Sequence, residues 1–186
     1  MKQDNSIGHH PQPTPIHPIH KQRKNDQHST VPFARRQRIL LVDDDRAVRD
    51  SIRDVLIEEG FLVLPAENGQ EAVEMANRTQ IDLVLLDLNL PVKNGWDTFA
   101  LLSNQHRELP IIIATARANQ IFTALSAGAS ALLEKPFEIT VLLATMEKLL
   151  AETGEQRLRR ITGKIAPFYH HPSSTNGPVV SSTGCE

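Results

Sequence analysis

Five polar residues of this 186-residue chain each follow an apolar segment: Asp43, Asp44, Asp87, Thr115 and Lys135. Short apolar segments of this kind are typical of strands buried on both faces of a parallel sheet. The carboxyl ends of such strands meet at one edge of the sheet, where open α/β sheets bind ligands. Carboxylates gathered there can hold a hard divalent cation, and a further carboxylate beside that cation can attack phosphorus. The sequence therefore indicates phosphoryl chemistry at this edge.

The region that would position these side chains alternates between strand and helix patterns. Strands are predicted at residues 38–42, 61–64, 83–86, 111–114 and 131–134. A segment with apolar residues at helical spacing follows each strand, and the last of these helices is predicted at 139–151. Alternating units of this kind form right-handed crossovers and a parallel sheet covered on both faces. We expect an α/β, flavodoxin-like, three-layer doubly wound fold with five helices and five strands in the order 2-1-3-4-5.

Charge and composition divide the chain into three parts. Residues 1–37 are basic and rich in His and Pro, whereas residues 38–152 carry ten basic and eighteen acidic side chains. Residues 153–186 are again basic and rich in Ser, Thr and Gly towards their end. The two outer parts bury too little apolar surface to offset the entropy of ordering. We therefore expect one domain at 38–152 between two disordered tails.

Several classes of protein are disfavoured by composition. No apolar stretch approaches the roughly 20 residues that a membrane-spanning helix needs, and the N-terminus lacks an apolar signal core. The single cysteine, Cys185, excludes an internal disulfide and fits a reducing compartment. Basic clusters at 21–24 and 35–38 lack interleaved aromatic residues and a recognisable nucleic-acid-binding fold. We expect a cytoplasmic protein without a membrane span, and these features do not favour binding to nucleic acid.

Five motifs follow the predicted strands in order along the chain. They are Leu-Val-Asp-Asp-Asp at 41–45, Asp-Leu-Asn-Leu-Pro-Val-Lys-Asn-Gly at 87–95, Ala-Thr-Ala at 114–116, Ala-Gly-Ala at 127–129 and Lys-Pro-Phe at 135–137. Each motif is weak alone, but their order and placement leave little room for coincidence. Residues 38–137 resemble the receiver domain of bacterial two-component response regulators, the family whose prototype is the chemotaxis response regulator. The resemblance covers neither tail.

The resemblance implies a phosphoacceptor and a metal site. Asp87 corresponds to the aspartate that accepts the phosphoryl group, and Asp43 and Asp44 correspond to the acidic pair that holds Mg²⁺ together with Asp87. Asn89 stands where the family supplies a backbone carbonyl to the same ion. Mg²⁺ prefers one or two carboxylates together with water and phosphate oxygen, and these residues match that preference.

Two further side chains complete the implied site. Thr115 corresponds to the hydroxyl that moves to bond a phosphoryl oxygen, and Lys135 to the lysine that pairs with the phosphoryl group. A cation and an ammonium are needed because charge collects on the phosphoryl oxygens during transfer. The resemblance also implies a cis peptide bond before Pro136. Asp45 lies beyond the metal pair and is expected to be solvated or to cap the following helix.

The chain departs from the family pattern in two places. Receivers commonly carry an aromatic residue in the fifth strand, and Leu132 stands at that position. The stretch from Thr115 to Gly128 is about two residues shorter than the family norm. Both departures concern the surface that changes on phosphorylation, so we expect a smaller or differently placed change than in typical receivers.

The resemblance implies a binding module and not an enzyme. The domain would accept phosphate on Asp87 from a sensor histidine kinase or a histidine phosphotransfer protein. It would then signal by binding an unknown downstream protein target or by phosphorelay, because no output domain is recognisable after the last predicted helix. One alternative is a phosphate-independent adaptor with the same fold. Another is a phosphotransferase or phosphatase like the haloacid dehalogenases, which is disfavoured because those enzymes have an acid where this chain has Asn89.

Overall fold

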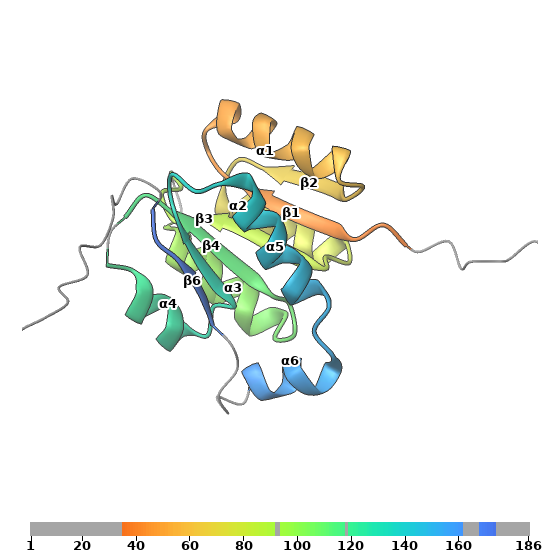
Figure 1. Cartoon of the computed structure of the whole chain (residues 1–186), viewed down its shortest axis with the longest axis vertical. Helices are drawn as coiled ribbons and strands as arrows, with labels where there is room; N and C mark the ends of the chain where they lie inside the picture. The colour runs from red at the N-terminus through yellow and green to blue at the C-terminus, as the bar shows by residue number, and fades with distance from the viewer. Residues whose placement is uncertain (1–34, 92–93, 118, 162–167, 174–186) are drawn as a thin grey trace, which may run out of the picture. The chain divides into compact units, whose positions relative to one another are not determined.

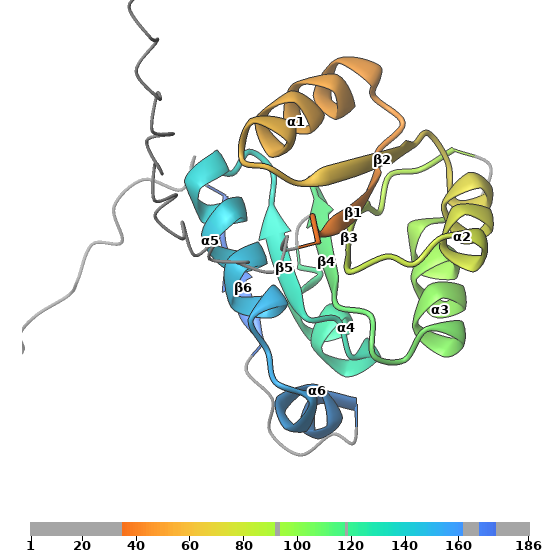
Figure 2. The ribbon, with the colours of Figure 1, turned by 90° about the vertical axis from the view of Figure 1, so that its right-hand side faces the viewer.

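The computed structural model describes residues 35–91, 94–117, 119–161 and 168–173, and its elements are labelled in Figures 1 and 2. Within these residues, six strands form one sheet in the order β2-β1-β3-β4-β5-β6. Every neighbouring pair is parallel. The strands are β1 Arg38–Val42, β2 Leu62–Ala66, β3 Leu83–Asp87, β4 Ile111–Thr115, β5 Ala131–Glu134 and β6 Tyr169–His171.

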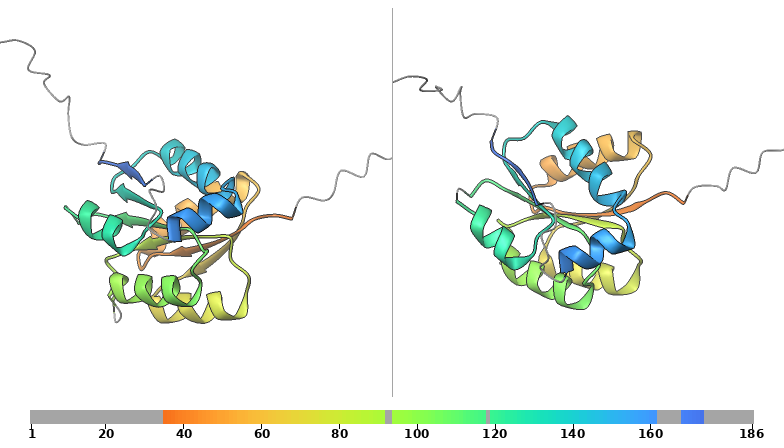
Figure 3. Two further views of the ribbon diagram at one scale, coloured as in Figure 1. Left: turned by 90° about the horizontal axis from the view of Figure 1, so that it is seen from below. Right: turned by 60° about the horizontal axis from the view of Figure 1, so that its bottom comes forward.

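Helices cover both faces of the sheet (Figures 2 and 3). Their bounds are α1 Arg46–Glu58, α2 Gly69–Arg78, α3 Gly95–Gln105, α4 Ile121–Ala127, α5 Ile139–Leu150 and α6 Gly154–Ile161. One apolar layer joins the sheet to α2, α3 and α4, and the other joins it to α1 and α5. The expected three-layer doubly wound fold with the strand order 2-1-3-4-5 is confirmed, and the structure adds one strand and one helix to it.

The central strands are apolar throughout because both of their faces are covered. In β1, Leu40 and Val42 pack in the layer of α2, α3 and α4, whereas Ile39 and Leu41 pack in the layer of α1 and α5. This alternation follows from side chains pointing to opposite faces at successive positions. A polar side chain therefore fits only where a strand ends, so the chemistry is confined to the edges of the sheet.

Side-chain caps begin the first two helices. Asp45 precedes α1 and accepts hydrogen bonds from the backbone N–H groups of Ala47 (2.8 Å) and Val48 (3.2 Å). This confirms that Asp45 caps the helix. Asn68 plays the same part for α2 by accepting a bond from the N–H of Glu71 at 2.9 Å. Such caps satisfy N–H groups that the first turn of a helix leaves free.

The predicted elements and the observed ones differ by one or two residues at their ends. The second strand was expected at 61–64, but the N–H of Phe61 bonds to the carbonyl of Leu56 at the end of α1. The strand therefore begins one residue later. It also runs on to Ala66, because the pairing with β1 extends as far as Val42.

The expectation of a disordered tail from residue 153 is wrong for residues 154–161 and 168–173. The first range contains α6, and the second contains β6, which pairs with β5. Three residues of the other predicted tail, 35–37, are described; Arg35 bonds to Asp82 and the carbonyl of Gln37 accepts from β2. The remainder of both predicted tails, 1–34, 162–167 and 174–186, lies outside the described residues. No helix in the described part of the chain is long and apolar enough to span a bilayer.

Candidate functional site at the carboxyl edge of the sheet

Three aspartates meet where the central strands end. Asp43 directly follows β1, Asp87 is the last residue of β3, and these two strands are neighbours in the sheet. Together with Asp44, each offers a carboxylate oxygen, and the three oxygens lie within 4.8 Å of one another. The structure therefore brings together the three carboxylates that the sequence analysis assigned to one site.

Lys135 joins the two buried carboxylates of this cluster. Its Nζ donates to Asp43 Oδ2 and to Asp87 Oδ2, both at 2.7 Å. The backbone holds the lysine in place, because its N–H bonds to the carbonyl of Thr115 at 2.8 Å. The peptide bond between Lys135 and Pro136 is cis, as the resemblance implied.

Burial shifts the ionisation of this group. The side chains of Asp43 and Asp87 are only 4% and 6% exposed. Burial raises the pKa of Asp43 above its usual value, although the hydrogen bond from Lys135 opposes this shift. Burial alone would lower the pKa of Lys135, but the hydrogen bonds to both carboxylates raise it overall. The lysine is therefore held as an ammonium between the two acids.

The donor set fits a magnesium ion. When all three carboxylates are ionised, Lys135 balances one of their negative charges and two remain. A divalent cation balances these two charges, whereas a monovalent cation does not. All of its ligand atoms are oxygen, which suits a hard cation. Asp44 is exposed whereas Asp43 and Asp87 are buried, so one side of the cluster is open to water. Mg²⁺ usually keeps several waters and binds through one or two protein carboxylates.

Thr115 and Asn89 flank the cluster. Thr115 is buried at the end of β4, and the residue before it, Ala114, is paired with Asp87. Its Oγ1 accepts a hydrogen bond from the N–H of Arg117 at 3.1 Å. Asn89 lies in the loop after β3, where its N–H donates to Asp87 Oδ1 at 2.9 Å. The role of its backbone carbonyl as a metal ligand stays a prediction.

Two arginines at this edge were not anticipated from the sequence. Arg117 Nε donates to Asn89 Oδ1 at 2.7 Å and so ties the loop after β4 to the loop after β3. Arg49 on α1 donates from Nη1 to the carbonyl oxygen of Asp43 at 2.6 Å. No local sequence pattern relates the residues in either contact. The sequence therefore gives no sign that these arginines differ from ordinary solvated ones.

Gly95 lets α3 start close to the loop after Asp87. A Cβ at this position would lie 2.4 Å from the Cα of Leu88 and 2.8 Å from the carbonyl oxygens of Asp87 and Leu88. All three atoms belong to the backbone and cannot move aside cheaply. A glycine is therefore required for this loop and the phosphoacceptor candidate to keep their positions.

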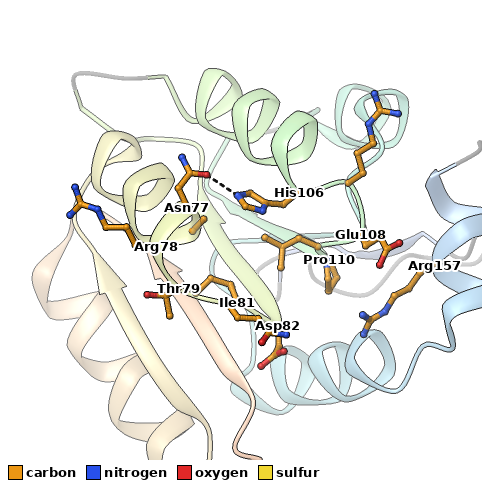
Figure 4. A pocket seen from close by; sticks show the side chains of 13 residues that line it. Asn77, Arg78, Thr79, Ile81, Asp82, His106, Glu108, Pro110 and Arg157 are labelled. Carbon is orange, nitrogen blue, oxygen red and sulfur yellow. Dashed lines mark hydrogen bonds between the residues drawn. The ribbon is translucent and has the colours of Figure 1, made fainter.

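A surface hollow of about 520 Å³ lies at the opposite edge of the sheet (Figure 4). Asp82 and Pro110 line it just before β3 and β4 begin, and Arg157 reaches towards it from α6. His106 and Asn77 bond across its upper wall at 3.1 Å. The carboxylate cluster does not line this hollow, so the two features are separate.

Comparisons with known proteins agree with this geometry. The family model of the response regulator receiver domain matches residues 39–147. Response regulator MprA of Mycobacterium sp. (strain KMS) is 41% identical over 119 residues, which are 63% of this chain and 52% of that protein. The protein of the same name from Mycobacterium leprae (strain TN) is 42% identical over 118 residues, 62% of this chain and 52% of the relative. The chain thus spans about half the length of these curated relatives.

Solved structures resemble the same region. A CheY-like response regulator receiver domain protein from Methanospirillum hungatei JF-1 has a TM-score of 0.60 and 28% identity, and the match covers 67% of this chain and 98% of that one. The response regulator TrrA from Thermotoga maritima, solved in complex with Mg²⁺-BeF, has a TM-score of 0.57 and 31% identity. That match covers 61% of this chain and 98% of the other.

Proposed function

Because this chain belongs to the response regulator receiver family, we propose that its domain accepts a phosphoryl group on Asp87 and signals through binding. The observation that carries the proposal is the bridge that Lys135 Nζ makes between the buried carboxylates of Asp43 and Asp87. A structural ion pair has matched charges, whereas this cluster has three acids and one ammonium group. It suits a site that receives a divalent ion and a phosphoryl group.

In the proposed reaction, a carboxylate oxygen of Asp87 attacks the phosphorus of a phosphohistidine. An O–P bond forms as the P–N bond breaks, and the released imidazole takes up a proton. Lys135 neutralises charge on the phosphoryl oxygens, and the hydroxyl of Thr115 donates to one of them. Asp43, Asp44 and Asp87, with the backbone carbonyl of Asn89, would hold Mg²⁺, which supplies electrostatic stabilisation of the transferred group when bound.

The proposal assigns the receiver unit to residues 38–152, with α6 and β6 as an extension. The phosphodonor would be a sensor histidine kinase or a histidine phosphotransfer protein, and the readout would be binding to a downstream protein or onward relay. We expect a cytoplasmic location and no catalytic turnover, and the basic clusters of the chain do not favour nucleic acid as a partner. These assignments concern the whole protein and rest on the family and on the site geometry together.

Phosphorylation of the full chain by acetyl phosphate and Mg²⁺ tests the proposal. Intact mass should rise by one phosphoryl group, and the modification should resist acid and be lost in base, as an acyl phosphate is. Asp87→Asn should abolish labelling because an amide is not a nucleophile. Asp97→Asn is the matched control, since Asp97 is exposed in the first turn of α3. Absence of labelling in the parent chain would favour the phosphate-independent adaptor, and full labelling of Asp87→Asn would refute the site.

A further inference from the structure

The edge of β5 is occupied by the chain's own C-terminal segment. In β6, Tyr169, His170 and His171 pair with Ala131, Leu132 and Leu133, respectively, as a parallel strand; both strands are labelled in Figure 2. The backbone N–H of Tyr169 also bonds to the carbonyl of Ser130 at 3.4 Å. We name residues 168–173 the edge latch, because they close the side of the sheet at which the five-stranded receiver would end.

The edge latch contacts both layers of the domain. Phe168 packs against the apolar cluster that contains Leu132 and α4, and Tyr169 packs against the cluster of α5. Lys148 Nζ lies 5.3 Å from the centre of the Tyr169 ring, a cation–π contact. His171 Nε2 lies 3.3 Å from Thr145 Oγ1 on α5. The latch therefore covers the surface that β5 and α5 would otherwise present.

A single glutamate connects the edge latch to the phosphoacceptor edge. Glu134 Oε1 lies 3.1 Å from His170 Nε2, and its Oε2 accepts from the N–H of Ser173 at 3.4 Å. Glu134 is paired with Thr115 across the β4–β5 ladder and immediately precedes Lys135. Any displacement of Thr115 or Lys135 therefore acts on the residue that anchors the latch.

The edge latch is weakly held. Its strand has three residues, each half-buried, and its two bonds to Glu134 are already near or beyond the long end of the normal range. Short edge elements with few buried contacts open at a small fraction of the global unfolding free energy. A shift of Glu134 would remove both of these bonds and so weaken the hold of the domain on the latch.

We propose that phosphorylation of Asp87 releases the edge latch from β5 and exposes the β5–α5 surface to a partner. The inference rests on the proposed function, because the phosphoryl group on Asp87 is what would draw Thr115 towards it and change the contacts that Lys135 already makes there. The exposed edge of β5 offers unpaired backbone groups, which suit a partner that adds an extended strand. The latch and that partner would compete for one surface, so the unphosphorylated protein is autoinhibited.

The chain offers a specific reporter, since Tyr169 is its only tyrosine. Full-length protein that contains 3-fluorotyrosine gives one ¹⁹F resonance, which reports on whether the latch is docked. His170→Ala removes the bond to Glu134 and supplies a reference with a weakened latch. Pro172→Ala is the matched control, because Pro172 is exposed and makes none of the ladder pairs. Mg²⁺ and beryllofluoride, which mimics the phosphoryl group, should shift the parent resonance towards the His170→Ala position.

Phosphorylation of the same samples by acetyl phosphate separates the two proposals. If Asp87 accepts phosphate and the resonance does not move, the latch inference is wrong and the proposed function stands. If Asp87 accepts none, both are wrong. Coupling between sites is reciprocal, so His170→Ala should also tighten beryllofluoride binding, by about fivefold at the lower end of typical couplings. Binding that is equal in the parent, His170→Ala and Pro172→Ala chains would overturn the inference.

Discussion

Carboxylates are neutralised in different ways at the amino and carboxyl edges of the sheet. At the amino edge, Asp82 is bonded by both Nη2 contacts of Arg35, at 2.7 and 2.8 Å, and by the N–H of Arg38 at 2.7 Å. This pair is matched in charge and open to water, with Arg35 46% exposed. At the carboxyl edge, the half-buried Lys135 bonds the carboxylates of Asp43 and Asp87, and the Asp44 carboxylate lies beside them. The charges of the first arrangement balance, whereas the second has an excess of negative charge.

The comparison shows that hydrogen-bond distance alone does not separate a structural ion pair from a pair in the candidate site. Arg35–Asp82 and Lys135–Asp87 both have contacts of 2.7 Å. What differs is the balance of charge and the access of water to it. An exposed and balanced pair adds little to stability, whereas a buried and unbalanced cluster stores repulsion that a ligand can relieve.

Replacement of the basic side chain at each edge, Lys135 or Arg35, should give the largest difference in the loss of unfolding free energy. Lys135→Ala leaves two buried carboxylates without their partner, so we expect a loss of about 3 kcal/mol in unfolding free energy without Mg²⁺. Added Mg²⁺ should restore much of this loss. Arg35→Ala should cost less than about 1 kcal/mol, because its pair is exposed. Urea unfolding followed through Trp96, the only tryptophan, measures both. Equal losses at the two edges would contradict the comparison.

Glycine substitutions should show which edge depends on close packing. Gly95→Ala places a Cβ against the backbone of Leu88 and Asp87, and we expect it to lower the unfolding free energy by about 1–3 kcal/mol. It should also slow phosphorylation by acetyl phosphate. Gly154→Ala, at the start of α6, meets no atom within 4 Å and should be neutral or stabilising by up to about 1 kcal/mol. A tolerated Gly95→Ala with unchanged labelling would show that the loop after Asp87 is not fixed.

Removal of an acidic side chain should change the stability of the protein in opposite directions at the two edges. In the absence of Mg²⁺, Asp44→Ala relieves repulsion and should stabilise the protein by up to about 1 kcal/mol. The same variant should lose most of the stabilisation that Mg²⁺ gives the parent chain. Asp82→Ala removes a satisfied acceptor and should instead destabilise by about 1 kcal/mol. Calorimetry of both variants with and without Mg²⁺ measures the direction of each stability change. Unchanged Mg²⁺ affinity in Asp44→Ala would exclude Asp44 as a ligand.

The smallest effect is expected at the lateral edge, in the edge latch. Burial lowers the pKa of His171 below its usual 6.5, and the positive charges of Lys148 and His170 add to this shift. The folded state therefore binds fewer protons than the unfolded state, so this contribution to stability is present above pH 6.5 and is lost as the pH falls below it. We expect a loss below about 1 kcal/mol, absent in His171→Gln. Urea midpoints at several pH values measure it, and identical profiles for the two proteins would contradict the assignment.

The carboxyl edge could be predicted from the sequence because its residues are tied to the ends of buried strands. Asp87 and Thr115 each end an apolar run, and the parallel fold then brings such ends together. Asp45 was identifiable as a cap from its type and position. These features depend on local patterns and on one rule of topology, and the structure agrees with them.

The sequence could not predict the edge latch, because its structure depends on a distant partner. The residues of β6 are two histidines and a tyrosine, without the alternation that marks a strand. They become a strand only because β5 offers a free edge 38 residues earlier in the chain. The contacts of Arg117 with Asn89 and of Arg49 with Asp43 were missed for the same reason.

The parallel direction of β6 also decides where the chain leaves the domain. After α5 ends at Leu150, the chain is at the amino edge of the sheet, where Arg157 of α6 lines the hollow. The parallel run of β6 then carries it back, so Ser173 lies beside Glu134 near the carboxyl edge. A binding module fused directly after Ser173 would therefore be tethered at the carboxyl edge of the sheet, and its effective concentration there would be set by the tether and not by diffusion through the cell.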